Sequence, residues 1–319
     1  MRRAYPPAVL GKDAGRLETA ARKIADIGIR PSLKSNEKKI FDRIDFQFPL
    51  PKRNDYFLNF YAYAHEGRSV VVLPVLSLKI LEDLATAYAW LFYNNYSLST
   101  VDLYFTMLQH RPRRKFQNVT YPPLLDALGI PRDALDNPQV DKLSLSFRNE
   151  AFAFILLHEM GHILFRHRGY DEITKAQARA DETQSDRFAL NVLERTGTPP
   201  LGAVLFFQAQ FYSMPHKGEF KSEDAWQDYL HKRSTHPLTG DRLSELARYI
   251  SGPLADRRPN EKVIWKFIGQ GLTTIIGILN DVELQRCMKL VAQNSPMEIL
   301  LPRKQVASLQ MNENCIGGR

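Results

Sequence analysis

The chain has 319 residues, of which 44% are hydrophobic and 24% are charged. This composition is typical of an ordinary soluble globular protein with one or two domains and a sizeable core. The formal net charge of +8 favours acidic partners in general, and these include RNA and the ribosome.

Several classes of protein are excluded by what the sequence lacks. Cys287 and Cys315 are the only two cysteines and have no metal-binding spacing, so we expect neither a disulfide framework nor a cysteine zinc site. The N-terminal residues lack the apolar core of a signal peptide. The apolar stretches at 70–93 and 263–279 are interrupted by charged or polar residues, or are too short to cross a bilayer. We therefore expect a cytoplasmic protein without a membrane segment.

The first part of the chain predicts a helix, a small sheet and a second helix. Residues 14–29 have helical periodicity and stop before Pro31. Short aromatic or β-branched runs follow between residues 41 and 75, and the last two are joined by a turn, which predicts a small antiparallel sheet. Ser77 is placed to cap a long helix that continues to Tyr93.

The remainder of the chain is predicted to be helical after a segment of loops. Residues 96–138 are rich in proline and charge and predict loops with short helices. The basic cluster from Arg111 to Lys115 indicates a solvated loop or a contact with an acidic partner or a nucleic acid. We do not expect nucleic-acid binding, because no fold signature for it is visible. Periodicity then predicts helices at about 147–168, 174–196, 200–213, 222–232 and 238–250, two more towards Val291, and a frayed tail.

The stretch "FILLHEMGHILFRHR" is an apolar helix with two histidines, a glutamate and a glycine at its centre. His158 and His162 are four residues apart, so they lie on one helix face and can bind one metal ion. With Glu159 beside them they form the HExxH arrangement, in which two imidazoles hold zinc and the glutamate takes a proton from a water molecule. The alternative, a buried helix with core histidines, leaves the Glu159 carboxylate uncompensated.

Gly161 and the end of this helix carry weaker signals. A glycine inside a helix costs about 1 kcal/mol relative to alanine, so Gly161 indicates either room beside a metal ion or close contact with another helix. Basic residues at 166–168 followed by Gly169 predict that the helix ends there.

A zinc site needs a third protein ligand, and the next predicted helix supplies acids. On a helical wheel, Glu182 and Asp186 lie in the middle of a stripe of small and apolar residues. We predict Glu182 as the third ligand and Asp186 as the residue that orients a histidine ligand or a water ligand. The alternative is an amphipathic helix whose acids meet an arginine elsewhere. His167 is a less well placed third ligand, and the metzincin pattern fails at Phe165 and Arg168.

The segment "STHPLTGDRLSEL" adds two candidate catalytic residues. Pro237 can start a helix whose first turns direct His236 and Arg242 towards a shared point. Alone, the segment is an ordinary helix start. Beside a zinc site, His236 is a candidate to stabilise the oxyanion of a tetrahedral intermediate, with Arg242 fixing the loop or a substrate carbonyl.

Three motifs in this order, HEMGH at 158–162, ETQSD at 182–186 and THPLTGDR at 235–242, resemble the membrane-embedded gluzincin peptidases of the HtpX and CAAX-prenyl-protease group. The chain is more similar to the soluble Lit-type phage-exclusion peptidase family, which also has a β-rich N-terminal part and a long aromatic helix before the metal helix. The resemblance extends over about residues 40–250. It departs from the family at Gln184 and Ser185, where an acid and an alanine are more usual.

This resemblance implies a mainly helical, zincin-like α+β metallopeptidase with a small antiparallel sheet in its N-terminal part. We expect one domain over residues 1–319, with the sheet and long helix at about 40–95, the zinc-binding catalytic core at 140–250, and C-terminal helices and a tail at 251–319. The resemblance implies Zn²⁺ held by His158, His162 and Glu182, with Glu159 as general base.

The family is associated with cleavage of a translation elongation factor during phage infection. The resemblance therefore implies a protein or peptide substrate, with a translation factor as one candidate, and a role in phage defence. The strand regions "YFLNFYAYA" and "SVVVLPV" either pair with an extended substrate or form plain core sheet.

Two other functions stay open. An ImmA-type regulatory peptidase would use the same zinc site, but no helix-turn-helix region is visible. A non-catalytic basic interaction module would hold a structural zinc ion with four protein ligands, and only three good ligands are visible in the sequence.

Overall fold

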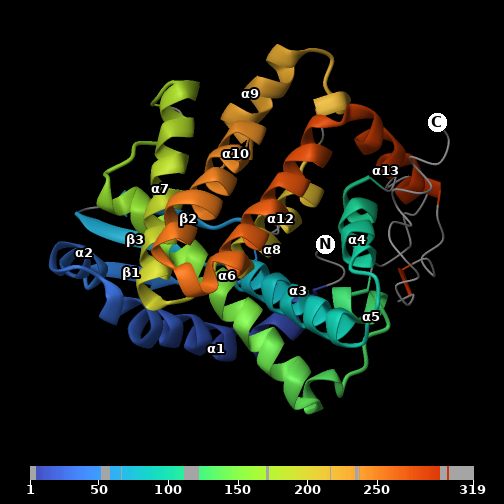
Figure 1. Ribbon diagram of the computed structural model, residues 1–319, viewed down its shortest axis with the longest axis horizontal. Helices are drawn as coiled ribbons and strands as arrows, with labels where there is room; N and C mark the ends of the chain where they lie inside the picture. Colours follow the sequence, from blue (N-terminus) through green and yellow to red (C-terminus); the bar gives the residue numbers. More distant parts are fainter. Residues whose placement is uncertain are drawn as a thin grey trace.

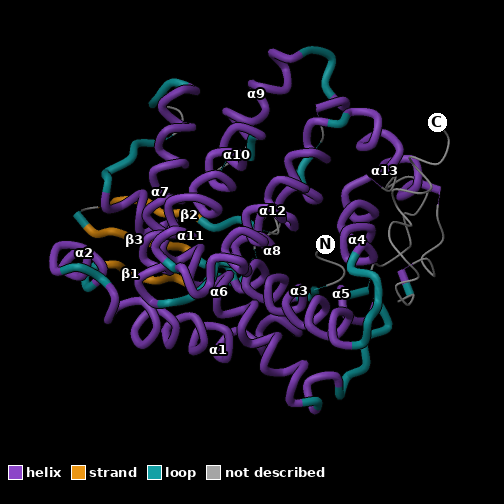
Figure 2. The backbone as a smooth tube through the Cα atoms, in the orientation of Figure 1, coloured by secondary structure: helices purple, strands orange, loops and turns teal. Residues whose placement is uncertain are grey.

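The structure is a computed structural model of the chain. It describes residues 5–51, 58–65, 67–110, 122–169, 172–215, 217–233, 236, 238–294 and 300–301. Helices make up most of the described chain and surround a small sheet that lies at one side of the molecule (Figures 1 and 2). The predicted mainly helical α+β fold is confirmed.

The sheet has three strands in the order β1-β3-β2. β2 (Tyr61–His65) and β3 (Arg68–Val72) form an antiparallel hairpin, as the sequence predicts. Gly67 in the turn has φ +76°, a conformation that glycine adopts without strain. β1 (Ile44–Gln47) instead runs parallel to β3, so the sheet is mixed. Because a long stretch of chain, and not a short turn, connects β1 to β3, these two strands can run parallel.

The helices before and after the sheet form much of the N-terminal core. The predicted helix at 14–29 is confirmed, and it begins earlier, as α1 (Pro7–Lys23) followed by a π-helical segment (Ile24–Ile29). The long helix after the sheet is α3 (Val75–Tyr93), which is buried along most of its length. Ser77 does not cap α3, because the helix begins at Val75 and the Ser77 hydroxyl accepts a hydrogen bond from the Asn59 N–H (3.2 Å).

The segment predicted as loops contains one substantial helix. α4 (Ser99–His110) buries an apolar face that includes Val101 and Phe105, and this burial outweighs the polar residues around it. The basic cluster from Arg111 to Lys115 lies outside the described residues. The remaining short elements before the HExxH helix are α2 (Ser35–Phe41), α5 (Leu124–Ala127) and 3-10 turns at Arg30–Ser32 and Ala134–Asp136.

The HExxH helix is α6 (Pro138–Leu164), and it ends earlier than predicted. Arg166 takes a left-handed conformation (φ +56°), and the His167 N–H donates to the His162 carbonyl (3.0 Å). Together with a bond from the Arg166 N–H to the Ile163 carbonyl, this is a Schellman ending. Arg166, rather than Gly169, therefore ends the helix and turns the chain back over it.

α6 lies against α7 (Lys175–Thr196), the helix that carries the predicted third ligand. A Cβ atom on Gly161 would lie 2.9 Å from Ser185 Cα, closer than real Cβ contacts come. Of the two explanations for Gly161, close contact between helices is the one that the structure supports. This contact brings the inward face of α7 next to the histidines of α6.

The C-terminal helices agree with the predicted pattern. α12 (Lys262–Asn280) is the main one. The helical stretch Pro259–Asn280 is long and apolar enough to cross a membrane by length and composition, with 28% of its apolar window buried, whereas the sequence predicted an apolar run too short for this. Cys287 is disulfide-bonded, which the sequence analysis did not expect, and the predicted frayed tail lies outside the described residues. The other elements are α8 (Leu201–Ser213), α9 (Glu223–Arg233), α10 (Gly240–Tyr249), α11 (Ala255–Arg257), α13 (Val282–Asn294), a π-helical turn at Ile250–Leu254 and 3-10 turns at Lys217–Glu219 and Pro259–Glu261.

Candidate metal centre

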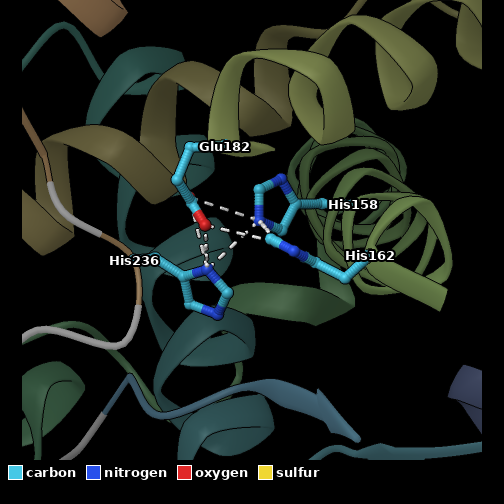
Figure 3. Close-up of side chains that lie close together, drawn as sticks. All are labelled: His158, His162, Glu182 and His236. Atoms are coloured by element: carbon cyan, nitrogen blue, oxygen red, sulfur yellow. Dashed lines mark hydrogen bonds and ion pairs between the residues drawn. The ribbon is translucent and has the colours of Figure 1, made fainter. Parts of the chain in front are cut away.

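Four side chains from three parts of the chain converge on one point (Figure 3). His158 and His162 come from α6, Glu182 comes from α7, and His236 comes from the segment between α9 and α10. One ligand atom of each residue lies within 4.8 Å of the others, so the group could hold a metal ion. The structure therefore brings together the three residues that the sequence predicts as ligands and adds His236 to them.

The separations between these ligand atoms are short and similar. His158 Nε2 lies 3.1 Å from His162 Nε2, 3.2 Å from His236 Nδ1 and 3.5 Å from Glu182 Oε2. Glu182 Oε1 lies 3.2 Å from His162 Nε2 and 3.0 Å from His236 Nδ1. Such a cluster of nitrogen and oxygen lone pairs is unfavourable unless a proton or a cation lies among them.

The partners of His236 show which of its nitrogens carries hydrogen. Nε2 lies 2.9 Å from the Phe60 carbonyl oxygen, which can only accept a hydrogen bond, and 3.1 Å from Glu159 Oε1. The proton of the neutral ring therefore belongs on Nε2, and the Nδ1 lone pair faces His158 and Glu182. This is the tautomer in which Nδ1 can bind a metal ion.

Asp186 lies on the other side of His158. His158 Nδ1 lies 2.8 Å from Asp186 Oδ1, so the ring and the carboxylate interact electrostatically. The carboxylate favours hydrogen on Nδ1 and leaves the Nε2 lone pair for the cluster. Burial lowers the pKa of His158, which keeps the ring in the neutral form that binds metals.

Arg242 pairs with two buried acids of α7, Glu182 and Asp186. Its guanidinium donates to Asp186 through Nε (2.6 Å) and Nη2 (2.8 Å), and Nη1 lies 2.6 Å from Glu182 Oε2. The sequence offered an arginine partner as the alternative to a metal site, and here the arginine pairing occurs beside a cluster that could hold a metal ion. Arg242 contacts Glu182, a member of that cluster, and Asp186, which contacts His158.

The charges of these buried groups are strongly coupled. Burial alone would raise the pKa of Glu182, but the positive charges of Arg242 and His236 outweigh it and hold that pKa well below its usual value. Burial likewise opposes a charge on His236, yet Glu182 and Glu159 raise the pKa of His236 well above its usual value. The cluster therefore attracts positive charge, whether as a proton on His236 or as a metal ion.

Glu159 lies beside the cluster, with 1% of its surface exposed. Burial would raise its pKa, but the charge of His236 outweighs this and lowers it, so the carboxylate is ionised. Oε1 lies 3.1 Å from His236 Nε2, whereas Oε2 has no hydrogen-bond partner within the part of the chain that the structure describes. A buried carboxylate oxygen that is free to accept a proton suits a general base.

His167 lies near the cluster but outside it. Its Nδ1 is 3.0 Å from His162 Nδ1, and its Nε2 is 3.0 Å from the Gln184 side-chain oxygen. It therefore neighbours a ligand residue and does not belong to the group that could hold the ion.

Two neighbours of His236 were missed by the sequence analysis. Gln210 Nε2 donates to the His236 carbonyl (3.0 Å), and Phe60 contacts the ring through its backbone oxygen. Gln210 was open to prediction, because it is a polar residue within the apolar helix α8. Phe60 could not be predicted from its side chain, because it contacts His236 through its backbone oxygen. Thr235 and Pro237 of the predicted motif lie outside the described residues.

Residues 132–268 match the family model of Peptidase U49. The matched segment contains all four residues of the cluster together with Glu159, Asp186 and Arg242. It supports membership of a peptidase family. Comparisons with curated proteins and with solved structures found no match.

Proposed function

We propose that this protein is a zinc-dependent endopeptidase that cleaves a peptide bond in a cytoplasmic protein. The observation that carries the proposal is the buried, unpaired Oε2 atom of Glu159 beside a metal-binding cluster. A structural metal site has no need of such a group, whereas hydrolysis requires a base next to the ion. The match of this segment to a peptidase family supports the same conclusion.

Zinc fits the residues of this cluster. Imidazole nitrogens with one carboxylate are ligands that zinc accepts, and tetrahedral zinc with bonds of about 2.0–2.1 Å separates its ligand atoms by about 3.4 Å. The separations that His158 makes to its three neighbours in the cluster are 3.1, 3.2 and 3.5 Å. The convergence of lone pairs described above gives a further reason for a cation at this point.

The residues of the chain have separate tasks in the proposed reaction. His158, His162 and Glu182 hold the zinc ion, which supplies Lewis acidity when it is bound. Glu159 accepts a proton from the attacking water and then passes it to the leaving amine. His236 is the candidate donor to the oxyanion of the substrate. Arg242 acts as a positioning residue through its contacts with Glu182 and Asp186.

An extended substrate is expected to pair with strand β2. β2 lies at one edge of the sheet and contacts α6, and the residue before it, Phe60, contacts His236. A peptide added to this edge would use backbone hydrogen bonds for affinity and would pass close to the cluster. The alternative is that β2 is only a structural strand of the core sheet. Burial of the neighbouring strand β3 is compatible with this, but the position of β2 at the sheet edge then has no role.

The cellular role follows from the resemblance of the three motifs to phage-exclusion peptidases. On that basis we propose a role in phage defence, with a translation factor as the first substrate to test. An ImmA-type regulatory peptidase is the second candidate within the same chemistry. A non-catalytic module with a structural zinc ion is favoured by one observation, namely that the cluster offers four protein ligands.

The proposal is tested by mapping new protein N-termini in a lysate of phage-infected bacteria. Zinc-loaded wild-type protein should generate a small set of new N-termini, and a chelator should abolish them. Glu159→Gln should retain zinc and lose cleavage by at least about 100-fold, as for removal of a general base. Glu150→Gln is the matched control, because Glu150 lies on the same helix and bonds instead to the Gly202 N–H (3.1 Å). Equal cleavage by Glu159→Gln would contradict the general-base role.

A further inference from the structure

His236 is held differently from the other three members of the cluster. His158, His162 and Glu182 lie on α6 and α7, two long helices in close contact. His236 lies between α9 and α10 in the chain and belongs to neither helix. Its backbone carbonyl is held by Gln210 and its ring by the Phe60 carbonyl. Three of the four residues are therefore fixed by the helical core, whereas His236 is held by hydrogen bonds to its carbonyl and ring and by its contacts with Glu159 and Glu182.

The orientation of the His236 ring suits a ligand better than an oxyanion donor. Its N–H faces Phe60 and Glu159, and its Nδ1 lone pair faces the cluster. An oxyanion donor must direct an N–H towards the substrate. In the arrangement described, that N–H is already occupied.

This arrangement closes the site in two ways. Catalytic zinc sites have three protein ligands and an open position for water, whereas closed sites have four protein ligands. With His236 in place, four ligand atoms surround the point of convergence. The same ring also engages Oε1 of Glu159, the proposed base.

We propose that His236 is a fourth, displaceable metal ligand that keeps the site closed at rest. This inference rests on the proposed peptidase function and concerns its regulation. Departure of His236 opens the water position and frees Oε1 of Glu159. The released ring can then present its N–H to the oxyanion, so one histidine serves both states.

The contact between His236 and Phe60 indicates which class of ligand would displace His236. This residue directly precedes β2, where an extended peptide is expected to add to the sheet. The backbone N–H groups of such a peptide compete for the carbonyl that holds the His236 ring. Binding of an extended peptide segment therefore weakens the closed state.

The test uses the Co²⁺-substituted full chain, whose visible spectrum reports the number and type of ligands, and azide as a small ligand for an open position. The wild-type protein should show a four-coordinate spectrum that azide barely changes. His236→Ala should change the spectrum and bind azide at least about tenfold more tightly. His110→Ala is the matched control, because His110 is a buried histidine at the end of α4 that contacts Glu219 and not the cluster, and it should behave as the wild type.

A second variant keeps the proposal open to refutation if His236→Ala does not fold. Gln210→Ala retains every ligand and removes the bond to the His236 carbonyl, so azide should bind severalfold more tightly than to the wild type. Identical spectra and azide affinities in the wild type and the variants would overturn the fourth-ligand proposal and leave the three-ligand peptidase intact. Failure of the folded wild-type protein to bind Co²⁺ or Zn²⁺ would instead contradict the proposed function itself.

Discussion

Asp186 links Arg242 to His158. One carboxylate oxygen, Oδ1, lies 2.8 Å from His158 Nδ1 and 2.8 Å from Arg242 Nη2, and Oδ2 accepts a second bond from Arg242 Nε. All three residues are buried. The orientation of a histidine in the candidate metal cluster therefore depends on an acid that is itself held by an arginine on another helix.

Replacing Asp186 with Asn should weaken metal binding by about 10- to 100-fold, the usual effect of removing the group that orients a histidine ligand. The reason is that the amide no longer favours hydrogen on His158 Nδ1. Competition with a zinc chelator measures this affinity. Asp181→Asn is the control, since Asp181 is a buried acid on the same helix that contacts Gln177 and His167. An Asp186→Asn protein with wild-type zinc affinity would refute the positioning role.

Replacing Arg242 with Leu should lower the free energy of unfolding of the metal-free protein by about 3–5 kcal/mol, because it leaves two buried carboxylates, Glu182 and Asp186, without their cation. Bound zinc should recover part of this loss. Urea unfolding with and without zinc measures both effects. Arg248→Leu is the control, since its side chain is 75% exposed, and it should change stability by no more than about 0.5 kcal/mol. An equally small effect at Arg242 would contradict the prediction.

Replacing Gly161 with Ala should destabilise the protein by about 1–3 kcal/mol, because the added methyl group would lie 2.9 Å from Ser185 Cα and force α6 and α7 apart. Zinc affinity should fall as well, since the ligands are divided between these helices. Gly15→Ala in α1 is the matched control. It meets no atom within 4 Å, so it should stabilise the protein by about 0.5–1 kcal/mol. A stabilising Gly161→Ala would show that the two helices can separate without cost.

The contribution of Asp102 to stability should fall as the pH rises from about 4 to about 7. Burial raises the pKa of this α4 carboxyl to about 7, although Gln208 and Tyr88 donate hydrogen bonds that oppose the shift. The folded protein then keeps a proton that the unfolded chain releases at about pH 4, so the free energy of unfolding decreases across this window and levels off above it. Urea unfolding at pH 5 and 7 should show a smaller difference for Asp102→Asn. The same difference in both proteins would exclude Asp102 as a cause.

Much of the site was predictable because its residues are repeated at helical spacing. His158 and His162 share a helix face, as do Glu182 and Asp186, and each pair stands out against apolar neighbours. Helix periodicity also gave α7 and α8 to within a residue or two of their bounds. Helical spacing is a local property of the sequence, so it can be predicted without knowing how distant segments of the chain fold.

The features that were predicted wrongly or missed depend on contacts between distant segments. The parallel direction of β1, the early end of α6 at Leu164 and the hydrogen bond that occupies Ser77 all follow from tertiary structure. The place of His236 within the cluster has the same origin. Its ring is oriented by the backbone oxygen of Phe60, a group that every residue carries and that no sequence pattern distinguishes.

The most direct test of a metallopeptidase is the metal content of the purified full chain, measured by mass spectrometry beside a Glu182→Ala variant. We expect about one zinc ion per wild-type chain and a clear loss in the variant, because Glu182 supplies the only carboxylate of the four-residue cluster described. Folded wild-type protein that contains no zinc under metal-replete, chelator-free conditions would contradict the metallopeptidase function and leave His158 and His162 as core residues of a buried helix.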